Sequence, residues 1–312
     1  MKPSVADLKN LAVFRAVTEH HGYSGAQTAL HMSQSAISFH IKALEDRVGF
    51  QVCRRGRQGF ELTDRGRVVY ERAKSLLAQV EDFDSEMGEL RMTATGTLRL
   101  GLVDNIISDR HLSMDEVVRE FLRKNHRARL DVRVNSPDEL ALSIANGELQ
   151  LAIVPEMNQM EGLQYRRIYT ELHSLYCGDR HPLFRVPDDE LTVETIRQHQ
   201  FVVRPYANQR ELARFPDAPV GASASNMEAQ AMFILTGYFI GTLPDHFAQY
   251  WLGEGRLRRL LPEALGIQSP FCVVSRTDRR PSLIMRNFIQ ELVANSIAHL
   301  HDDSRERSSD SG

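Results

Sequence analysis

Three unbroken heptads of apolar side chains distinguish this chain from an ordinary globular sequence. Between residues 69 and 90 they recur in alternating steps of four and three: Val69, Ala73, Leu76, Val80, Phe83, Met87 and Leu90. On a helix this spacing gives one narrow apolar stripe, and the remaining faces are rich in charged residues and Gln. Such a stripe is typical of two helices that pair by knobs-into-holes packing. Residues 64–93 are therefore predicted to form a dimerising linker helix, and the alternative is a surface helix packed on its own domain.

The residues before this helix carry the pattern of three helices and a hairpin. Apolar residues at helical spacing precede Gly22, a short helix covers about residues 24–30, and Ser33 can cap a third helix that reaches about Val48. Two short apolar segments then flank a turn rich in Gly and Arg. Residues 1–63 are therefore predicted to form a winged helix-turn-helix, a fold that places one helix in the major groove of DNA.

The residues after the heptads alternate apolar strands with helical segments. The strands are expected at residues 97–103, 130–134, 149–154, 163–177, 201–203, 220–224, 239–243 and 271–275. The helices are expected at residues 112–124, 137–146, 227–236, up to residue 251, and 282–298. Repeated β-α-β units imply parallel sheets with ligand crevices at the carboxyl ends of the strands. The polar residues 301–312 are predicted to be a disordered tail.

Charge and composition narrow the class of protein. The net charge is −3, yet the first 65 residues carry nine Lys and Arg against six Asp and Glu, whereas the rest carries 29 against 35. A small basic module on an acidic body suits DNA contact at one end. No stretch is apolar for the ~20 residues of a membrane span, and no signal peptide is recognised. The three cysteines lack metal-like spacing, so we expect a cytoplasmic protein without a membrane partner.

The predicted third helix and the wing carry a specific motif. It consists of Ser33-Gln34-Ser35-Ala36-Ile37-Ser38, Ile41-Lys42, Leu44-Glu45 and Gly49, followed by Leu62-Thr63-Asp64-Arg65-Gly66. This motif resembles that of the LysR-type transcriptional regulators. Residues 95–101 and 147–153 resemble segments of the family's C-terminal domain, so the resemblance covers essentially residues 5–300. The chain departs from the family's motif at Gln27, Cys53, Gln150, the pair Phe39-His40 and the wing arginines. The departures near the DNA-binding helix concern the base preference of the protein.

The resemblance implies a multidomain protein: an all-α-type winged helix-turn-helix plus a long linker helix, followed by an α/β two-lobed, periplasmic-binding-protein-like domain. The effector-binding domain would span residues 94–300, with lobe I at about 94–160 plus 270–300 and lobe II at about 161–269. The implied function is regulation of promoter activity, with no enzymatic role and no cofactor. The implied partners are a promoter inverted repeat in double-stranded DNA, a small-molecule effector, further copies of the chain as a dimer of dimers, and RNA polymerase if the protein activates.

The candidate DNA-binding residues lie on the third helix and in the wing: Ser33, Gln34, Ser35, Ser38, Phe39, His40, Lys42, Arg54, Arg55 and Arg57. Gln34 can bond an adenine edge bidentately, and Phe39 can contact a thymine methyl. Lys42 and the arginines are placed to hold phosphates, which contribute affinity rather than sequence information. In the alternative, Ser33 only caps the helix and Phe39 packs within the domain or dimer.

The candidate effector-binding residues follow strand ends or lie in later strands: Asp104, Asn105, Ser136, Arg204, Gly241 and Thr242. Short polar side chains and free helix amides there could hold a carboxylate or a similar group. Asp104 would repel an anion unless it is compensated, so the charge of the effector stays open. The alternative is that these residues are ordinary helix caps.

The sequence favours a regulator over three other functions. An enzyme is not supported, because no HExxH, GxSxG, Walker or GxGxxG motif is present. A transport-type solute-binding protein would need an export signal and would not need residues 1–93. A thiol redox sensor would use Cys177 and Cys272, which lie in apolar strands where inert thiols are usual. The pair His20-His21 at a helix end is expected to be a cap rather than a metal site.

Overall fold

The computed structural model describes residues 4–56, 59–89 and 96–309 of the 312-residue chain. The chain divides into two compact units. The first comprises residues 1–91 and 146–148, and the second comprises residues 92–145 and 149–312. Within the described residues, no helix is both long and apolar enough to cross a membrane.

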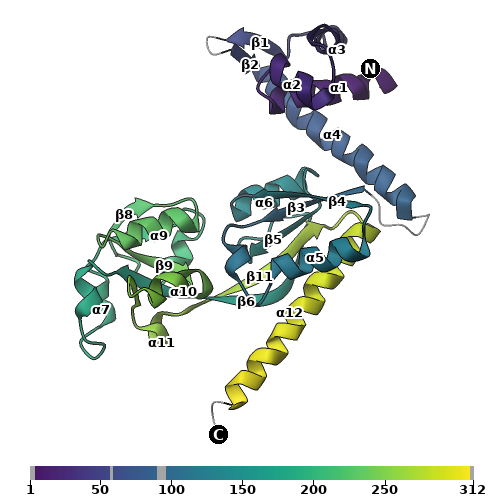
Figure 1. The fold of residues 1–312 in the computed structure, drawn as a ribbon. Helices are drawn as coiled ribbons and strands as arrows, with labels where there is room; N and C mark the ends of the chain where they lie inside the picture. Colours follow the sequence, from purple (N-terminus) through teal and green to yellow (C-terminus); the bar gives the residue numbers. More distant parts are fainter. Residues whose placement is uncertain (1–3, 57–58, 90–95, 310–312) are drawn as a thin grey trace. The chain divides into compact units, whose positions relative to one another are not determined.

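The first unit has the predicted winged helix-turn-helix (Figure 1). Its elements are α1 (Val5–Glu19), α2 (Tyr23–Leu30), α3 (Gln34–Val48), β1 (Cys53–Gly56), β2 (Gly59–Leu62) and α4 (Asp64–Glu89). Its core is formed mainly by Val13, Phe14, Val17, Ala26, Ile37, Ile41, Leu44 and Val52. β1 and β2 pair antiparallel as a hairpin. The apolar stripe of α3 therefore fixes which face of that helix remains outside.

The ends of α3 follow from the residues at its boundaries. The hydroxyl of Ser33 accepts a hydrogen bond from the amide of Ala36 at 3.3 Å, which satisfies one of the free amides of the first turn. Gly49 ends the helix at φ 81°, a left-handed conformation that favours glycine. The helix expected from the sequence therefore has the expected bounds.

The second unit is built on one mixed sheet, with strand order β4-β3-β5-β11-β6-β9-β7-β8, and β10 paired to β6. The strands are β3 (Gly96–Leu102), β4 (Ala128–Val134), β5 (Leu151–Pro155), β6 (Leu163–Gly178), β7 (Phe201–Val203), β8 (Val220–Ser223), β9 (Ile240–Pro244), β10 (Leu257–Arg259) and β11 (Ile267–Arg276). β3 is parallel to β4 and β5, and β7 is parallel to β8 and β9. β11 is antiparallel to β5 and β6, and β6 is antiparallel to β9, so the expected parallel sheets are joined through antiparallel strands.

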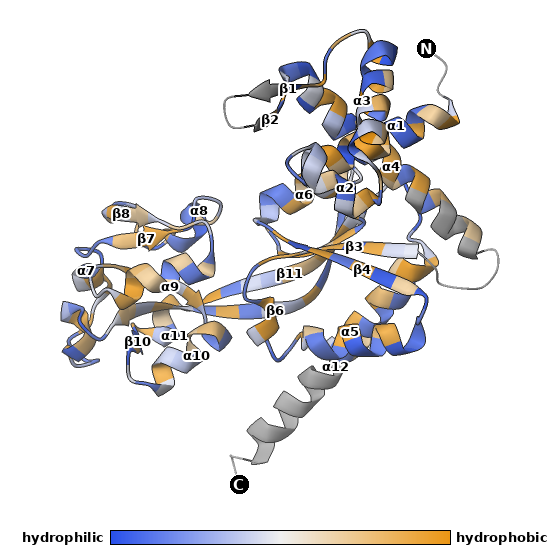
Figure 2. Cartoon of the chain, turned by 45° about the horizontal axis from the view of Figure 1, so that its top comes forward, coloured by the Kyte–Doolittle hydropathy of each residue, from blue (hydrophilic) through white to orange (hydrophobic). Residues whose placement is uncertain are grey.

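Helices cover this sheet, and several short ones were not expected from the sequence. The helices are η1 (Ile106–Ser108), α5 (Met114–Lys124), α6 (Pro137–Ala145), η2 (Pro182–Arg185), α7 (Val193–Ile196), α8 (Asn208–Glu211), α9 (Met227–Leu235), α10 (Asp245–Gly253), α11 (Pro262–Leu265) and α12 (Leu283–Ser309). Figure 2 shows apolar residues concentrated along the strands, whereas α5 carries both polar and apolar residues. This pattern matches an amphipathic helix packed on a core.

Two strands cross between the two lobes of this unit. The core of lobe I comes mainly from residues 98–154 and 271–292, and lobe II has separate apolar clusters. β6 and β11 run through both lobes, side by side from Leu163 to His173 of β6 (Figure 1). The sequence predicts that lobe II begins at about residue 161. In the structure Tyr165 and Tyr169 still pack with the lobe I core, because one long strand serves both lobes.

The C-terminal segment also differs from the expectation. Residues 301–312 were predicted to be a disordered tail, but α12 extends to Ser309. Residues 310–312 lie outside the described residues. Once a helix has formed, adding a residue costs little, and Arg and Glu in this segment favour helix. Polarity alone therefore did not predict where the helix ends.

A buried histidine in lobe II leads to a prediction about stability against pH. His181 caps η2, because its Nδ1 accepts the amide of Leu183 at 3.1 Å. Burial, with the neighbouring ring of His199, lowers the pKa of His181 to about 4. Protonation of His181 is therefore less favourable in the folded state than in the unfolded state. The free energy of unfolding is highest above about pH 6.5, where His181 is neutral in both states, and it decreases as the pH falls toward 4. The variant His181→Asn keeps a hydrogen-bond acceptor but has no titrating ring. We expect its melting temperature to fall less than that of the wild type between pH 7 and pH 4.5.

Between pH 7 and pH 4.5 the wild type should lose about 2 kcal/mol more free energy of unfolding than His181→Asn, or several degrees more in melting temperature. His126→Gln is the matched control, because His126 is exposed. Equal slopes for the wild type and His181→Asn would contradict this role of His181.

Candidate DNA interface and effector cleft

The exposed face of α3 carries the candidate DNA-binding residues. Gln34, Ser35, Ser38, Phe39 and Lys42 are all exposed. Phe39 is 70% exposed in the single chain, so it does not pack within its own domain. A large aromatic side chain exposed in the second turn of α3 is consistent with contact to a partner.

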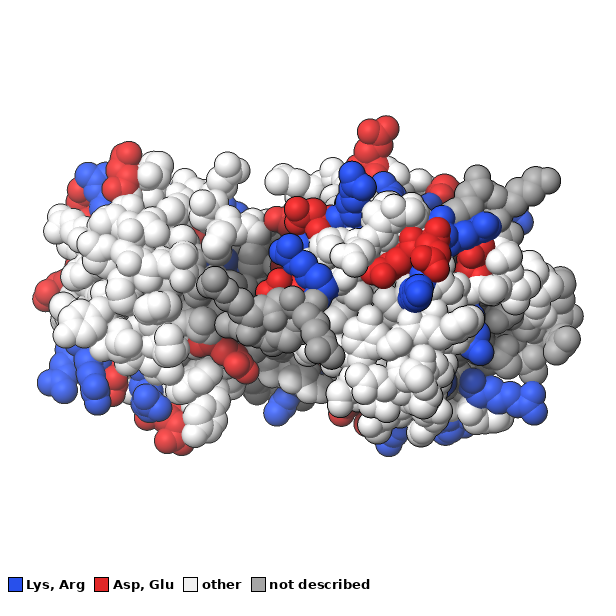
Figure 3. All heavy atoms as spheres, turned by 90° about the horizontal axis from the view of Figure 1, so that it is seen from above, with Lys and Arg blue, Asp and Glu red and all other residues white. Residues whose placement is uncertain are grey.

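A surface groove connects α3 with the wing. It is lined by His21, Gly22, Tyr23, Ser24, Gly25, Gln34, Ser38, Gln51, Cys53, Arg54 and Phe60. Two polar side chains of α3, Gln34 and Ser38, therefore face the same groove as Arg54 of β1. On the face drawn in Figure 3, the described basic and acidic side chains are interspersed.

Several candidates have partners within the chain. His40 lies with Nδ1 2.8 Å from Oδ1 of Asn10 on α1, and burial, together with the charge of Lys9, lowers its pKa. Ser33 is occupied as a helix cap, and Arg54 pairs with Glu61 at 3.6 Å. The side chain of Arg55 and all of Arg57 lie outside the described residues. The structure thus gives His40 and Ser33 roles inside the domain.

The second unit contains a cleft between its lobes. Lobe I and the crossing strands contribute Val103, Asp104, Pro155, Met157, Glu171, His173, Ile267, Ser269 and Phe271 to its lining. Lobe II contributes Arg204, Tyr206, Ala207, Arg210, Glu211, Met227 and Pro244. The free volume inside is about 30 Å³, enough for ordered water but not for a metabolite. In this conformation the cleft is closed.

Arg204 lies in the cleft but is held by a buried carboxylate. Its Nε donates to Oε1 of Glu211 at 2.8 Å, and its amide donates to Oε2 of the same residue at 2.9 Å. Both side chains are less than a tenth exposed. Burial by itself disfavours the charged guanidinium, yet the charge of Glu211 raises the pKa of Arg204 overall. Arg204 therefore stabilises lobe II whether or not it also contacts an effector.

Asp104 connects the two lobes directly. Its Oδ2 accepts a hydrogen bond from the amide of Met227, the first residue of α9, at 2.5 Å. It also accepts from Nδ2 of Asn105 at 3.1 Å. Burial raises the pKa of Asp104, although the amide bond and the charge of Arg204 oppose this. A lobe I carboxylate thus occupies the positive end of a lobe II helix.

The other four effector candidates do not line this cleft. Ser136 is half-buried and forms a capping box, since its amide and hydroxyl donate to Oε2 of Glu139 at 3.1 and 2.8 Å. A Cβ at Gly241 would lie 2.8 Å from Cγ1 of Val202, so packing requires glycine there. Thr242 is buried, and its carbonyl accepts from Gln230 at 2.8 Å. Asn105 bonds to Asp104 without lining the cleft.

Several cleft residues were not predicted from the sequence: Glu171, His173, Tyr206 and Arg210. Glu171 and His173 lie two apart in β6, so they share one face of a strand. Two ionisable residues alternating within an apolar strand are a pattern that could have indicated them. Arg210 follows Arg204 by six residues and had no comparable pattern.

The three cysteines are all buried and free. Burial raises the pKa of Cys177 to about 12 and that of Cys272 to about 11. Since the thiolate is the reactive form, these residues are poorly suited to redox sensing.

Comparison with known sequence families identifies the class of protein. "Bacterial regulatory helix-turn-helix protein, lysR family" matches residues 8–67, and "LysR substrate binding domain" matches residues 92–296. This chain belongs to the LysR family. It is therefore a DNA-binding transcriptional regulator with an effector-binding domain, and its relatives are regulators rather than enzymes.

Individual relatives agree with this assignment. The HTH-type transcriptional activator BauR of Pseudomonas aeruginosa is 35% identical over 285 residues, covering 91% of this chain and 93% of BauR. Full-length CbnR complexed with its target DNA is 18% identical, with a TM-score of 0.66, covering 92% of this chain and 99% of CbnR. LysG from Corynebacterium glutamicum with bound effector Arg is 21% identical, with a TM-score of 0.51, covering 93% and 98%. The two structures share the fold of this LysR-family chain.

Proposed function

We propose that this LysR-family regulator binds an interrupted inverted repeat as a dimer whose two α3 helices read the half-sites. The observation that carries the proposal is the exposed face of α3, where Gln34 and Ser38 line one groove with Arg54. Dimers that bind through recognition helices read sites one helical turn or a multiple apart, so the target has matching symmetry. Mapping the bound genomic sites tests this, and a non-repeating bound sequence would reject it.

The dimer would form through α4. Leu76, Val80, Phe83 and Met87 are exposed in the single chain. Val69, at the start of the heptads, instead packs with the core of the first unit, and Leu90 lies outside the described residues. An exposed apolar stripe of this length on one helix favours pairing with a second copy. By family resemblance, two such dimers would form the tetramer.

The effector would bind in the cleft between the lobes. Arg210 is half-buried there, and its Nη1 donates to Oγ of Ser269 at 3.4 Å. Burial and the nearby charge of Arg204 lower the pKa of Arg210, so an added anion would be favourable. Nη2 of Arg210 donates to the carbonyl oxygen of Gln268, so the two hydrogen-bond partners of this guanidinium among the described residues are both neutral. We therefore favour a small polar effector with an anionic group.

Opening of the closed cleft would couple the effector to DNA. An effector shifts an equilibrium only by its differential affinity for the two states. A cleft with about 30 Å³ of free volume must rearrange before it holds a metabolite, so binding would favour a different lobe arrangement. That change would alter the shape of the DNA-bound tetramer. Because BauR is named an activator, we extend activation, with RNA polymerase as partner, to this chain.

The effector site can be tested by a thermal-shift screen of the full chain. The compounds would be small carboxylates, sulfonates and phosphates, with neutral polar compounds of similar size for comparison. An anionic effector at 100 times its Kd should stabilise the wild type by about 2.7 kcal/mol. In Arg210→Gln the binding free energy should weaken by about 1.5–3 kcal/mol, because a hydrogen bond to a charged group is lost. At the same effector concentration the stabilisation should therefore fall to about 0.3–1.3 kcal/mol.

Two control variants separate the site from general stability. Arg214→Gln removes an exposed arginine of the same lobe and should keep the full response. Ser136→Ala removes the cap of α6 and should lower the melting temperature by an equivalent of about 1 kcal/mol while keeping the response. Retention of the response in Arg210→Gln, or its loss in Ser136→Ala, would contradict the proposed position of the effector.

A further inference from the structure

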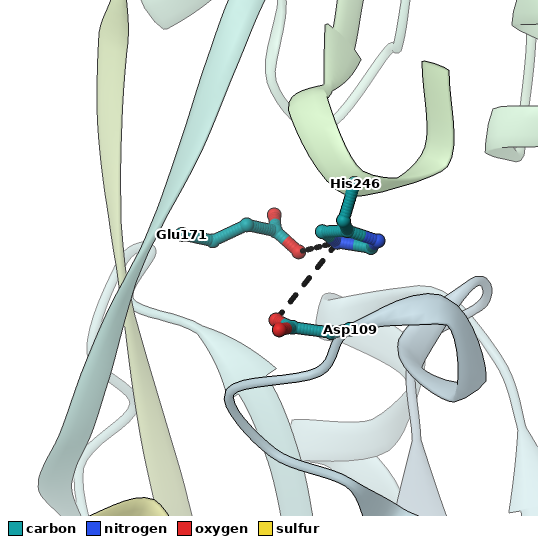
Figure 4. A group of neighbouring side chains, drawn as sticks. All are labelled: Asp109, Glu171 and His246. Carbon is teal, nitrogen blue, oxygen red and sulfur yellow. Dashed lines mark hydrogen bonds and ion pairs between the residues drawn. The ribbon is translucent and has the colours of Figure 1, made fainter. Parts of the chain in front are cut away.

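Three buried ionisable side chains meet where the two lobes join (Figure 4). Asp109 follows η1 in lobe I, Glu171 lies in the crossing strand β6, and His246 lies in α10 of lobe II. Their side chains are 1%, 7% and 15% exposed. Nε2 of His246 lies 2.8 Å from Oε1 of Glu171 and 3.9 Å from Oδ2 of Asp109. One ring nitrogen thus faces two carboxylates.

Ser108 lies against the other ring nitrogen of His246. Its Oγ is 2.9 Å from Nδ1 of His246 and 2.9 Å from the carbonyl oxygen of Asn105. The single hydroxyl proton can serve only one of these two contacts, so Nδ1 can be either the donor or the acceptor toward Ser108. In both cases Nε2 faces the two carboxylates.

A proton at Nε2 does not satisfy the whole cluster. One N–H can point to Glu171 at 2.8 Å, but Oδ2 of Asp109 is then left as a buried oxygen without a hydrogen-bond partner. The other oxygen of Asp109 already accepts from the amide of His111 at 2.8 Å. The same Oδ1 also lies 3.2 Å from Nδ1 of His111, so the atom of this carboxylate without a hydrogen bond is Oδ2, which faces His246 at 3.9 Å.

We propose that a divalent transition metal ion of the Zn²⁺ class binds Asp109, Glu171 and His246 together. An ion can contact all three donor atoms, which lie within 4.8 Å of one another, whereas a proton serves one oxygen. One imidazole nitrogen with two carboxylate oxygens is a donor set typical of Zn²⁺ and its neighbours, and Mg²⁺ and Ca²⁺ prefer oxygen alone. Ser108 on Nδ1 and His173 on the second oxygen of Glu171 would orient the ligands.

The proposed metal site lies where the two lobes join. Its ligands come from lobe I, from a crossing strand and from lobe II, so the ion links the lobes next to the cleft. Glu171 also lines that cleft, which brings the ion close to any effector. Bound metal should therefore stabilise the closed arrangement of the lobes. This inference does not depend on which effector binds.

The test uses untagged full-length protein, freed of metal with a chelator, and Zn²⁺ alone as the probe. In competition with a chromogenic chelator, we expect one equivalent of Zn²⁺ per chain and a higher melting temperature. Asp109→Asn and His246→Gln remove direct ligands and should weaken binding by at least about 100-fold, since even outer partners contribute 10–100-fold. Ser108→Ala should weaken it about 10-fold. His126→Gln, an exposed histidine outside the cluster, should bind as the wild type does.

The outcomes separate the proposal from an ordinary ion pair. Co²⁺ should give the visible absorption of a protein-bound ion in the wild type and lose it in Asp109→Asn. If the wild type binds no stoichiometric Zn²⁺ up to about 100 µM, hydrogen bonds alone hold the cluster and the proposal is wrong. Equal binding by Asp109→Asn and the wild type would also overturn it. Ser108 is exposed, so Ser108→Ala keeps the test decisive if a ligand variant does not fold.

Discussion

Replacing Leu76 by aspartate is expected to convert the assembly into monomers. Leu76 is 39% exposed on α4 and shares its stripe with Val80 and Phe83. A charge placed in a paired apolar seam has no partner there and loses much of its hydration. We expect an association penalty of several kcal/mol, which raises the dissociation constant by at least about 100-fold. Light scattering over a range of protein concentrations measures this change.

Val68→Asp is the matched control for the dimer. Val68 is an exposed apolar residue of the same helix, 62% exposed, but it lies outside the heptad positions. The control should keep the wild-type mass. An unchanged mass for Leu76→Asp would mean that α4 packs within its own chain, which is the alternative left open by the heptads.

Substituting Gln34 by alanine is expected to flatten base preference at one position of each half-site. Gln34 lies in the first turn of α3, is exposed, and faces the groove beside Arg54. A bidentate contact to an adenine edge contributes about 1–3 kcal/mol of discrimination against other bases. The loss should therefore be about 5- to 150-fold for the preferred base and small for the others. Binding assays on a library of half-site variants measure this profile.

The variant Lys42→Ala distinguishes residues that contribute affinity for any DNA from residues that recognise particular bases. Lys42 is exposed two turns further along α3, where a phosphate contact is expected. Its loss should weaken all sequences alike and reduce the slope of log K against log salt by about one. An unchanged preference profile in Gln34→Ala, or a base-specific loss in Lys42→Ala, would show that α3 lies differently on DNA.

The DNA-binding end was predictable because its signals are local. Ser33, the apolar stripe through Ile37 and Ile41, and Gly49 fix both ends and the buried face of α3 within 17 residues. The structure confirms the helix and its exposed face. What the sequence did not reveal is that His40 bonds to Asn10, a residue thirty positions away on another helix.

The effector cleft was less predictable because its residues come from distant segments. The sequence predicts binding residues mainly at strand ends, where β-α-β units place ligands. Asp104 satisfies that rule, but Ser136 serves as a cap and Gly241 packs against Val202. Glu171 instead lies inside β6, which enters the cleft because it pairs with β11 nearly a hundred residues later. Antiparallel pairing at that separation leaves no local trace in the sequence.

The hydrogen bond from Met227 to Asp104 has a consequence for how sensitively such a regulator responds. If an effector binds in the cleft as proposed, opening the cleft would first break this contact, so the apparent dissociation constant would equal the intrinsic one divided by the open fraction. A change of 1.4 kcal/mol in that internal contact moves the response threshold by about tenfold. The concentration at which a gene is switched can therefore be retuned by Asp104 and its neighbours, with every contact between protein and effector left unchanged.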